Sequence, residues 1–138
     1  VPQINDIYMI KSGATTGKVA IVDTDRKFTI WSPLAVFRCN PNKMNYMYLL
    51  YFLQSDVYQK QVQDKWTYGT QQNIGMRSLE KLFVCFPSLD EQRNIADYLN
   101  EQCIRIEKNI NERKLIIQKL KEYKKSLIYE VVTGKKEV

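Results

Sequence analysis

The sequence predicts an α+β protein, in which a small mixed α/β domain is followed by one long C-terminal coiled-coil helix. Before Pro87, short runs of β-branched and aromatic residues alternate with Gly, Asn and Pro, which is the pattern of strands and turns. After Pro87, no Gly or Pro occurs until Gly134, and apolar residues recur at helical spacing. The chain has 138 residues, 44% of them hydrophobic, so it can form one small domain with its own core.

Five segments of the first part are predicted as strands, because β-branched and aromatic residues are concentrated in them. They are Ile7–Ile10, Lys18–Asp23, Phe28–Trp31, Leu34–Arg38 and Leu82–Phe86. The Asn40–Pro41–Asn42 segment interrupts the series, since Pro lacks a backbone donor and restricts the residue before it. The segment Trp66–Gly75 is predicted to be rich in turns, because turn-forming residues are frequent in it.

Helical spacing of apolar residues appears from about Asn45 to Lys65, with Ser55–Asp56 as the point that would divide this stretch into two helices. A short helix is expected over Ser78–Leu82. The long helix is predicted to run from Leu89 to Thr133. It is preceded by Ser88 and has Glu91 three residues later, the pattern of a capping box.

The long helix carries a coiled-coil seam, because steps of four and three from Leu99 fall mostly on apolar residues. These positions are Leu99, Cys103, Ile106, Ile110, Arg113, Ile117, Leu120, Lys124, Leu127 and Val131. A helix of this length cannot bury such a stripe against a globular part this small, so a second helix is expected to cover it. A single long core helix is the simpler alternative.

Composition limits the chemistry open to the chain. There is no His, which excludes Ser-His-Asp and Cys-His catalytic sites and disfavours an ordinary zinc site. The three Cys have no disulfide spacing, which indicates a reducing, cytoplasmic compartment. No apolar run approaches the roughly 20 residues of a membrane span, so no membrane partner is expected. Neither a metal nor a cofactor is predicted.

The net charge of +6 suits a partner with a phosphate backbone, although charge alone does not identify one. Residues 1–89 carry 10 basic and 6 acidic side chains, whereas residues 90–138 carry 11 and 9. The excess of positive charge therefore belongs mainly to the globular part, and the nearly balanced helix suits a protein partner.

The loop from Lys11 to Lys18 is the first candidate contact site. Gly13 and Gly17 resemble a P-loop only superficially, because they enclose three residues and Val19 follows the Lys in place of Ser or Thr. Two interpretations remain open: a plain tight loop, or a DNA-contacting loop. In the second, the Lys and hydroxyl side chains would bind phosphates or bases. The residues proposed for contact are Lys11, Ser12, Thr15, Thr16 and Lys18.

A second candidate loop places several amide side chains beside Gly69. Gln and Asn can bond two edges of adenine at once, which is suited to the major groove. A polar turn that caps the following helix explains the same residues equally well. The residues proposed for contact are Lys65, Thr70, Gln71, Gln72 and Asn73.

Taken in order, these motifs resemble the specificity (S) subunits of Type I restriction-modification systems. The resemblance covers nearly the whole chain and rests on the segments 12–21, 48–55, 69–74, 79–82, 86–95, 120–128 and 132–135. One departure is Ser88, where the family commonly has a second Pro. The resemblance implies a target recognition domain over residues 1–87, truncated at its N-terminus, a coiled-coil helix over 88–133 and a tail over 134–138.

The resemblance also implies a non-catalytic DNA-recognition role. The globular part would read one half of a bipartite target in double-stranded DNA. The helix would pair antiparallel with a helix from the other half, or from a second copy in a homodimer. Its pairing residues would be Leu99, Ile106, Ile110, Ile117, Leu120 and Leu127. The helical region would dock modification (methyltransferase) subunits and, through them, the restriction subunit. Two rivals are the specificity tail of a single-chain restriction-methyltransferase and a coiled-coil module that reads no bases.

Overall fold

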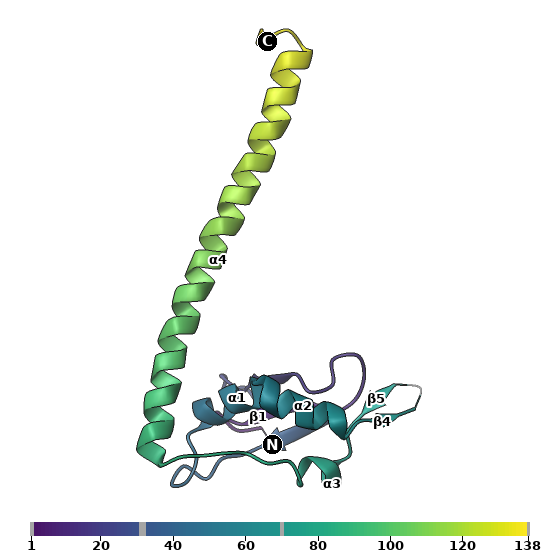
Figure 1. The fold of residues 1–138 in the computed structure, drawn as a ribbon, viewed down its shortest axis with the longest axis vertical. Coiled ribbons are helices and arrows are strands. Elements are labelled where there is room, and N and C mark those ends of the chain that lie inside the picture. The colour runs from purple at the N-terminus through teal and green to yellow at the C-terminus, as the bar shows by residue number, and fades with distance from the viewer. Residues whose placement is uncertain (1, 31–32, 70, 138) are drawn as a thin grey trace. The chain divides into compact units, whose positions relative to one another are not determined.

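The computed structural model describes residues 2–30, 33–69 and 71–137 (Figure 1). Residues 1–97 and 98–138 form two compact units. The elements in chain order are β1 (Ile7–Ile10), β2 (Val19–Ile21), β3 (Leu34–Phe37), α1 (Tyr46–Gln54), α2 (Asp56–Asp64), β4 (Thr67–Tyr68), β5 (Gln72–Asn73), α3 (Met76–Leu79) and α4 (Leu89–Val132). The predicted α+β class is therefore confirmed.

The first three strands form an antiparallel sheet with β1 in the middle, in the order β2-β1-β3. Ile7 lies opposite Ile21 on one side and Phe37 on the other. Ile7 and Met9 are fully buried, whereas Tyr8 and Ile10 between them are half-buried. This alternation is the period of two expected for a strand, and it gives the sheet one core face and one outward face.

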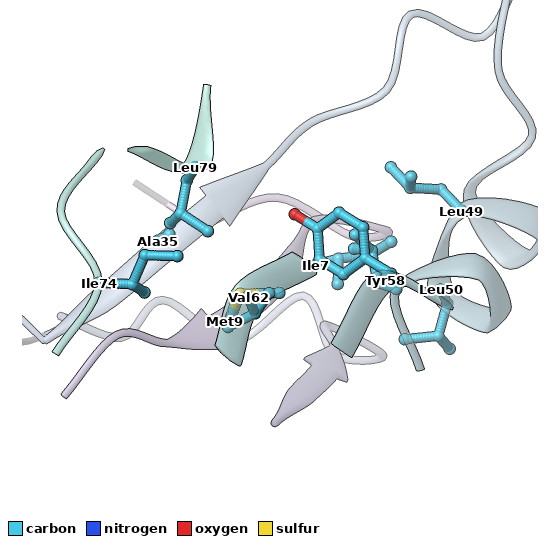
Figure 2. Packing of buried hydrophobic residues seen from close by; sticks show 10 residues of the cluster. Ile7, Met9, Ala35, Leu49, Leu50, Tyr58, Val62, Ile74 and Leu79 are labelled. Carbon is cyan, nitrogen blue, oxygen red and sulfur yellow. The ribbon is translucent and has the colours of Figure 1, made fainter. Parts of the chain in front are cut away.

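Helices α1 and α2 supply most of the remaining core, which packs on the Ile7 and Met9 side chains. Figure 2 shows Tyr58 and Val62 of α2 close to these two residues. Tyr58 is 1% exposed, and its burial raises the pKa of its phenol to about 12. The face that α2 turns to the sheet is thus buried at Tyr58 and Val62, as a close-packed core requires.

Ser55 is the point where α1 ends and α2 begins, as the sequence predicts. Its backbone is extended, with φ −68° and ψ 150°, which interrupts the helical path. The Ser55 hydroxyl donates to the carbonyl of Phe52 at 2.6 Å and accepts from the backbone N–H of Tyr58 at 3.4 Å. One side chain therefore caps both helices.

The predicted strand Phe28–Trp31 is wrong for residues 28–30, which are not in a strand, and Trp31 lies outside the described residues. Both edges of β1 are already occupied by β2 and β3. Residues 22–30 instead lead from the end of β2 toward the start of β3. Phe28 and Ile30 line an apolar hollow of about 530 Å³ together with Tyr8 and Ile10 of the outward face. This segment therefore lies against the face of the sheet and not at its edge.

The turn-rich segment Trp66–Gly75 contains a small hairpin of β4 and β5, which was not predicted from the sequence (Figure 1). The predicted strand Leu82–Phe86 is also wrong, because no strand is found there. The Gln61 amide donates to the carbonyl of Phe83 at 3.1 Å and accepts from its N–H at 2.9 Å. A side chain, not a neighbouring strand, thus satisfies this backbone. The short helix α3 starts and ends slightly earlier than expected, at Met76–Leu79.

The long helix α4 begins and ends as the local sequence predicts, within one residue. The backbone N–H of Glu91 donates to the hydroxyl of Ser88 at 3.4 Å, which is one half of the expected capping box. At the other end Gly134 adopts φ 71°. The N–H of Lys135 donates to the carbonyl of Glu130 at 2.8 Å, the bond that characterises a Schellman C-cap.

Candidate nucleic-acid interface

The first candidate loop connects β1 to β2 as a tight, internally bonded turn. The N–H of Ile10 donates to the carbonyl of Lys18 at 2.9 Å, and the N–H of Gly17 donates to the carbonyl of Ile10 at 2.8 Å. Gly17 adopts φ 93°, a backbone conformation that residues other than Gly rarely adopt. The loop conformation therefore depends on Gly at this position.

Gln59 of α2 holds this loop against the helices. Its amide donates to the carbonyl of Gly17 at 2.9 Å and to that of Leu53 at 2.7 Å. A Cβ added at Gly17 would lie 2.6 Å from the Gln59 amide oxygen. The loop backbone is thus fixed on the globular unit while its exposed side chains, such as Thr15 and Lys18, face solvent.

The two candidate loops meet, although about 60 residues separate them in the sequence. Ser12 lies opposite Asn73 in an antiparallel bridge. The N–H of Gly13 donates to the carbonyl of Gln72, and the N–H of Ile74 donates to the carbonyl of Lys11, both at 2.9 Å. The chain after β1 therefore pairs with β5, and Ser12 of the first loop and Gln72 and Asn73 of the second belong to one continuous ribbon.

The predicted contact residues differ in their accessibility. Five are exposed, three are half-buried and one is buried, while Thr70 lies outside the described residues. The exposed residues are Thr15, Lys18, Lys65, Gln71 and Asn73. The half-buried residues are Lys11, Ser12 and Gln72, and the buried residue is Thr16. Thr16 is only 8% exposed, and its hydroxyl donates to the carbonyl of Gly13 at 2.7 Å. Thr16 therefore closes the loop through this hydrogen bond.

Thr67 is a polar residue of this ribbon that sequence reasoning did not identify. It pairs with Asn73 across the hairpin and is exposed. Its hydroxyl donates to the carbonyl of Asn73 at 3.2 Å. The alternation of Trp66, Thr67 and Tyr68 is typical of a strand and could have indicated β4, but a strand of two residues gives a weak pattern.

An ion pair lies at the start of β1, whereas the ribbon follows the end of that strand. Arg38 donates from Nε and Nη2 to the two carboxylate oxygens of Asp6, at 2.7 and 2.6 Å. These hydrogen bonds hold the pKa of the Asp6 carboxyl below its ordinary value, against the opposing effect of burial. Because Asp6 precedes β1 and Lys11 follows it, this pair supports the sheet and is separate from the ribbon.

The predicted seam of α4 is largely open to solvent in the described part of the chain. Ile106, Ile110, Ile117 and Leu120 are 44–59% exposed, while Leu99 and Leu127 at the two ends are half-buried. Further apolar side chains, Ile116, Tyr123 and Ile128, lie beside this stripe and are also exposed. Apolar exposure on this scale marks a surface that associates with something else.

The described residues contain neither a candidate metal site nor a candidate membrane span. Within them, no group of three or more His, Cys, Asp or Glu side chains is placed to hold a metal ion. None of the helices in the described ranges is both long and apolar enough to cross a membrane.

A small α+β domain with Lys, hydroxyl and amide side chains in two adjoining loops, continued by a long helix with an exposed apolar stripe, has the features expected of a DNA-recognition domain. The comparison with family models identifies the particular family. Residues 1–127 match the model described as the Type I restriction modification DNA specificity domain. The chain belongs to this family, and its role is that of a specificity component in Type I restriction-modification. A search of curated protein sequences gives no match.

Proposed function

We propose that the chain reads one half of a bipartite target in double-stranded DNA and catalyses nothing itself. The observation that carries this proposal is the bridge between Ser12 and Asn73. It unites two loops with Lys, hydroxyl and amide side chains in one fixed surface. Lys supplies attraction to phosphates, and amides supply discrimination between bases, so the ribbon holds both kinds of contact that sequence-specific binding needs.

In this proposal the contact set is the one listed for the two loops, with different tasks for its members. Lys11, Lys18 and Lys65 bind phosphates and position the duplex. Ser12, Thr15, Thr70, Gln71 and Asn73 are the candidates for direct contact with bases or phosphates. Gln72 supports the ribbon through its backbone, whose carbonyl accepts from the N–H of Gly13. Thr16 supports the loop from inside, because its hydroxyl is already bonded to Gly13.

The helix serves assembly in the same proposal. Residues 1–87 act as the target recognition domain, 88–133 as the pairing helix and 134–138 as a tail. The seam packs antiparallel against a helix from the other half of the specificity subunit or from a second copy of the chain. The exposed apolar side chains on the seam support this, because packing against a partner helix removes their apolar surface from water. Modification subunits dock on the helical region and bring the restriction subunit with them.

A domain swap followed by methylome sequencing tests the proposal. The chain replaces the segment that aligns with it in a working specificity subunit, and the methylated sites of the host genome are then read. We expect one half of the methylated target to change while the other half and the methylation chemistry stay the same. The same swap with Asn73→Ala is the matched control, because it retains every backbone hydrogen bond of the ribbon.

Other results of the swap, or of tests on the chain alone, support the rival functions. Continued methylation at the old target means that the segment is a scaffold, a coiled-coil module without base reading. Methyltransferase activity of the chain alone would contradict the non-catalytic assignment and favour a tail of a single-chain enzyme. If methylation is lost altogether, binding of the intact chain to duplex DNA at low salt decides: absence of any binding contradicts the proposal.

A further inference from the structure

We infer that one row of side chains across the ribbon, Thr67–Asn73–Ser12, reads the bases, with Asn73 reading an adenine in the major groove. Thr67 is the new specificity-determining residue in this inference, and Gln72 is removed from base reading. The inference rests on the proposed DNA-reading function and specifies which face of the ribbon performs it.

The backbone pairing places the three residues side by side. Asn73 is paired with Thr67 on one side and with Ser12 on the other. The two hydrogen bonds that flank Ser12 and Asn73 join their neighbours, not the two residues themselves. This is the narrow, non-hydrogen-bonded type of antiparallel pair, in which Cα atoms are about 4.5 Å apart and side chains on the same face are close.

Gln72 lies on the other face of the ribbon. Successive side chains of a strand point to opposite faces, so Gln72 shares its face with Ile74 and not with Asn73. Ile74 is 1% exposed and belongs to the core, whereas Asn73 is exposed and Gln72 is half-buried. A ribbon that presents the Asn73 face to a groove therefore turns Gln72 toward the protein.

The chemistry of the row suits base edges in the major groove. No hydrogen bond of the Asn73 side-chain amide is found among the described residues, so both its donor and its acceptor can face an adenine. The Thr67 hydroxyl uses its proton on the Asn73 carbonyl, which leaves its oxygen as an acceptor for a base amino group. Strands about 4.8 Å apart make this row roughly 9–10 Å wide, a span of two to three base pairs.

The pairing with Thr67 also explains why Asn73 is suited to this task. The Thr67 hydroxyl and the bridge to Ser12 hold the Asn73 backbone from both sides. A side chain whose backbone is fixed in this way loses less conformational freedom when it binds. Gln71 lacks such support, because it precedes β5 in the turn.

Selection of bound duplexes from a randomised pool, with the intact chain, tests the inference. Asn73→Ala should abolish the preference for one A·T pair, a loss of roughly 5- to 150-fold in discrimination. Thr67→Val should weaken the preference at a neighbouring pair, whereas Thr67→Ser, which keeps the hydroxyl, should retain it. Gln72→Ala should leave every preference unchanged. Thermal unfolding of each variant checks that the domain is intact.

The outcomes separate this inference from the proposed function. If the wild-type chain selects no motif, the DNA-reading function itself is contradicted. If it selects a motif that Gln72→Ala changes and Asn73→Ala does not, the opposite face reads and the inference is overturned. The same holds if Asn73→Ala relaxes a position that is not A·T, or if Thr67→Val and Thr67→Ser behave alike.

Discussion

The side-chain oxygen of Gln92 accepts a hydrogen bond from the backbone N–H of Asn45 at 2.8 Å, which joins the first turn of α4 to the start of α1. The Gln92 amide nitrogen donates to the carbonyls of Lys43 at 3.2 Å and Pro87 at 2.9 Å. Gln92 is 0% exposed. One buried amide thus satisfies three backbone groups from two segments and anchors the base of α4 in the globular unit.

Replacing Gln92 by Leu should lower the free energy of unfolding by about 2–3 kcal/mol, because three backbone groups lose their partner. The neighbouring exposed amide offers a matched control: Asn94→Leu should change stability by less than about 0.5 kcal/mol. Chemical unfolding followed by circular dichroism measures both. Equal stabilities of the two variants would show that the Gln92 hydrogen bonds contribute little.

The Asp6–Arg38 pair should make stability depend on pH in the acid range. The pKa of Asp6 is lowered in the folded state, so its contribution is complete well above the ordinary value of 3.8. This contribution is lost as the pH falls through the lowered pKa, because below that pH the Asp6 carboxyl is protonated in both the folded and the unfolded state. Asp6→Asn should therefore cost about 1–3 kcal/mol at neutral pH and progressively less below pH 4.

Unfolding of Asp6→Asn and the wild type at several pH values measures this effect. The exposed Asp23 supplies the control, since Asp23→Asn removes the same charge without breaking an ion pair seen in the structure. A constant difference between Asp6→Asn and the wild type from neutral to strongly acid pH would contradict the assignment.

Gly17→Ala should destabilise the domain by about 1–2 kcal/mol, because an L residue is strained at positive φ. The added Cβ would also press on the Gln59 amide, which must then release the carbonyl of Gly17. Gly75→Ala is the matched control, as no atom lies within 4 Å of the added Cβ there. Thermal unfolding distinguishes the two, and a stable Gly17→Ala variant would mean that the loop adapts freely.

Lys18→Gln should weaken binding to every duplex and reduce the slope of log affinity against log salt by about 1, since one phosphate contact is lost. Titrations at several salt concentrations with a selected and an unrelated duplex provide the measurement. Lys136→Gln, beyond the end of α4, is the charge-matched control and should leave the slope unchanged. A change in preference at one base pair only would instead make Lys18 a base reader.

Ile117→Lys should abolish self-association of the chain, because the substitution would place a charge in the seam of both paired helices. Leu115→Lys is closely matched: Leu115 is 53% exposed and Ile117 52%, but Leu115 lies on another face of α4. Sedimentation velocity and light scattering across micromolar concentrations compare the two. A wild-type chain that is monomeric throughout this range would contradict pairing with a second copy.

Local sequence determined the helices well. Ser55 divides α1 from α2, Ser88 starts α4 and Gly134 ends it, because caps depend on residues within one turn of the helix end. The exposed stripe of α4 was equally visible in the spacing of its apolar residues. Such features need no information about distant parts of the chain.

Strand pairing was less predictable, because a partner strand can come from anywhere in the chain. Phe28–Ile30 and Leu82–Phe86 have the composition of strands, yet one lies on the outward face of the sheet and the other is held by Gln61. The hairpin of β4 and β5 was not predicted, since strands of two residues give only a weak alternation pattern.

The candidate surface was likewise predictable from the sequence in part, while the rest of it depends on the tertiary structure. Its Lys, hydroxyl and amide residues, and the family to which the chain belongs, follow from residue types in order along the sequence. The pairing of Ser12 with Asn73, the burial of Thr16 and the pairing of Thr67 with Asn73 follow only from the tertiary fold. The physical reason is that hydrogen bonds between distant backbone segments decide which side chains share a face, and residue order alone does not encode that pairing.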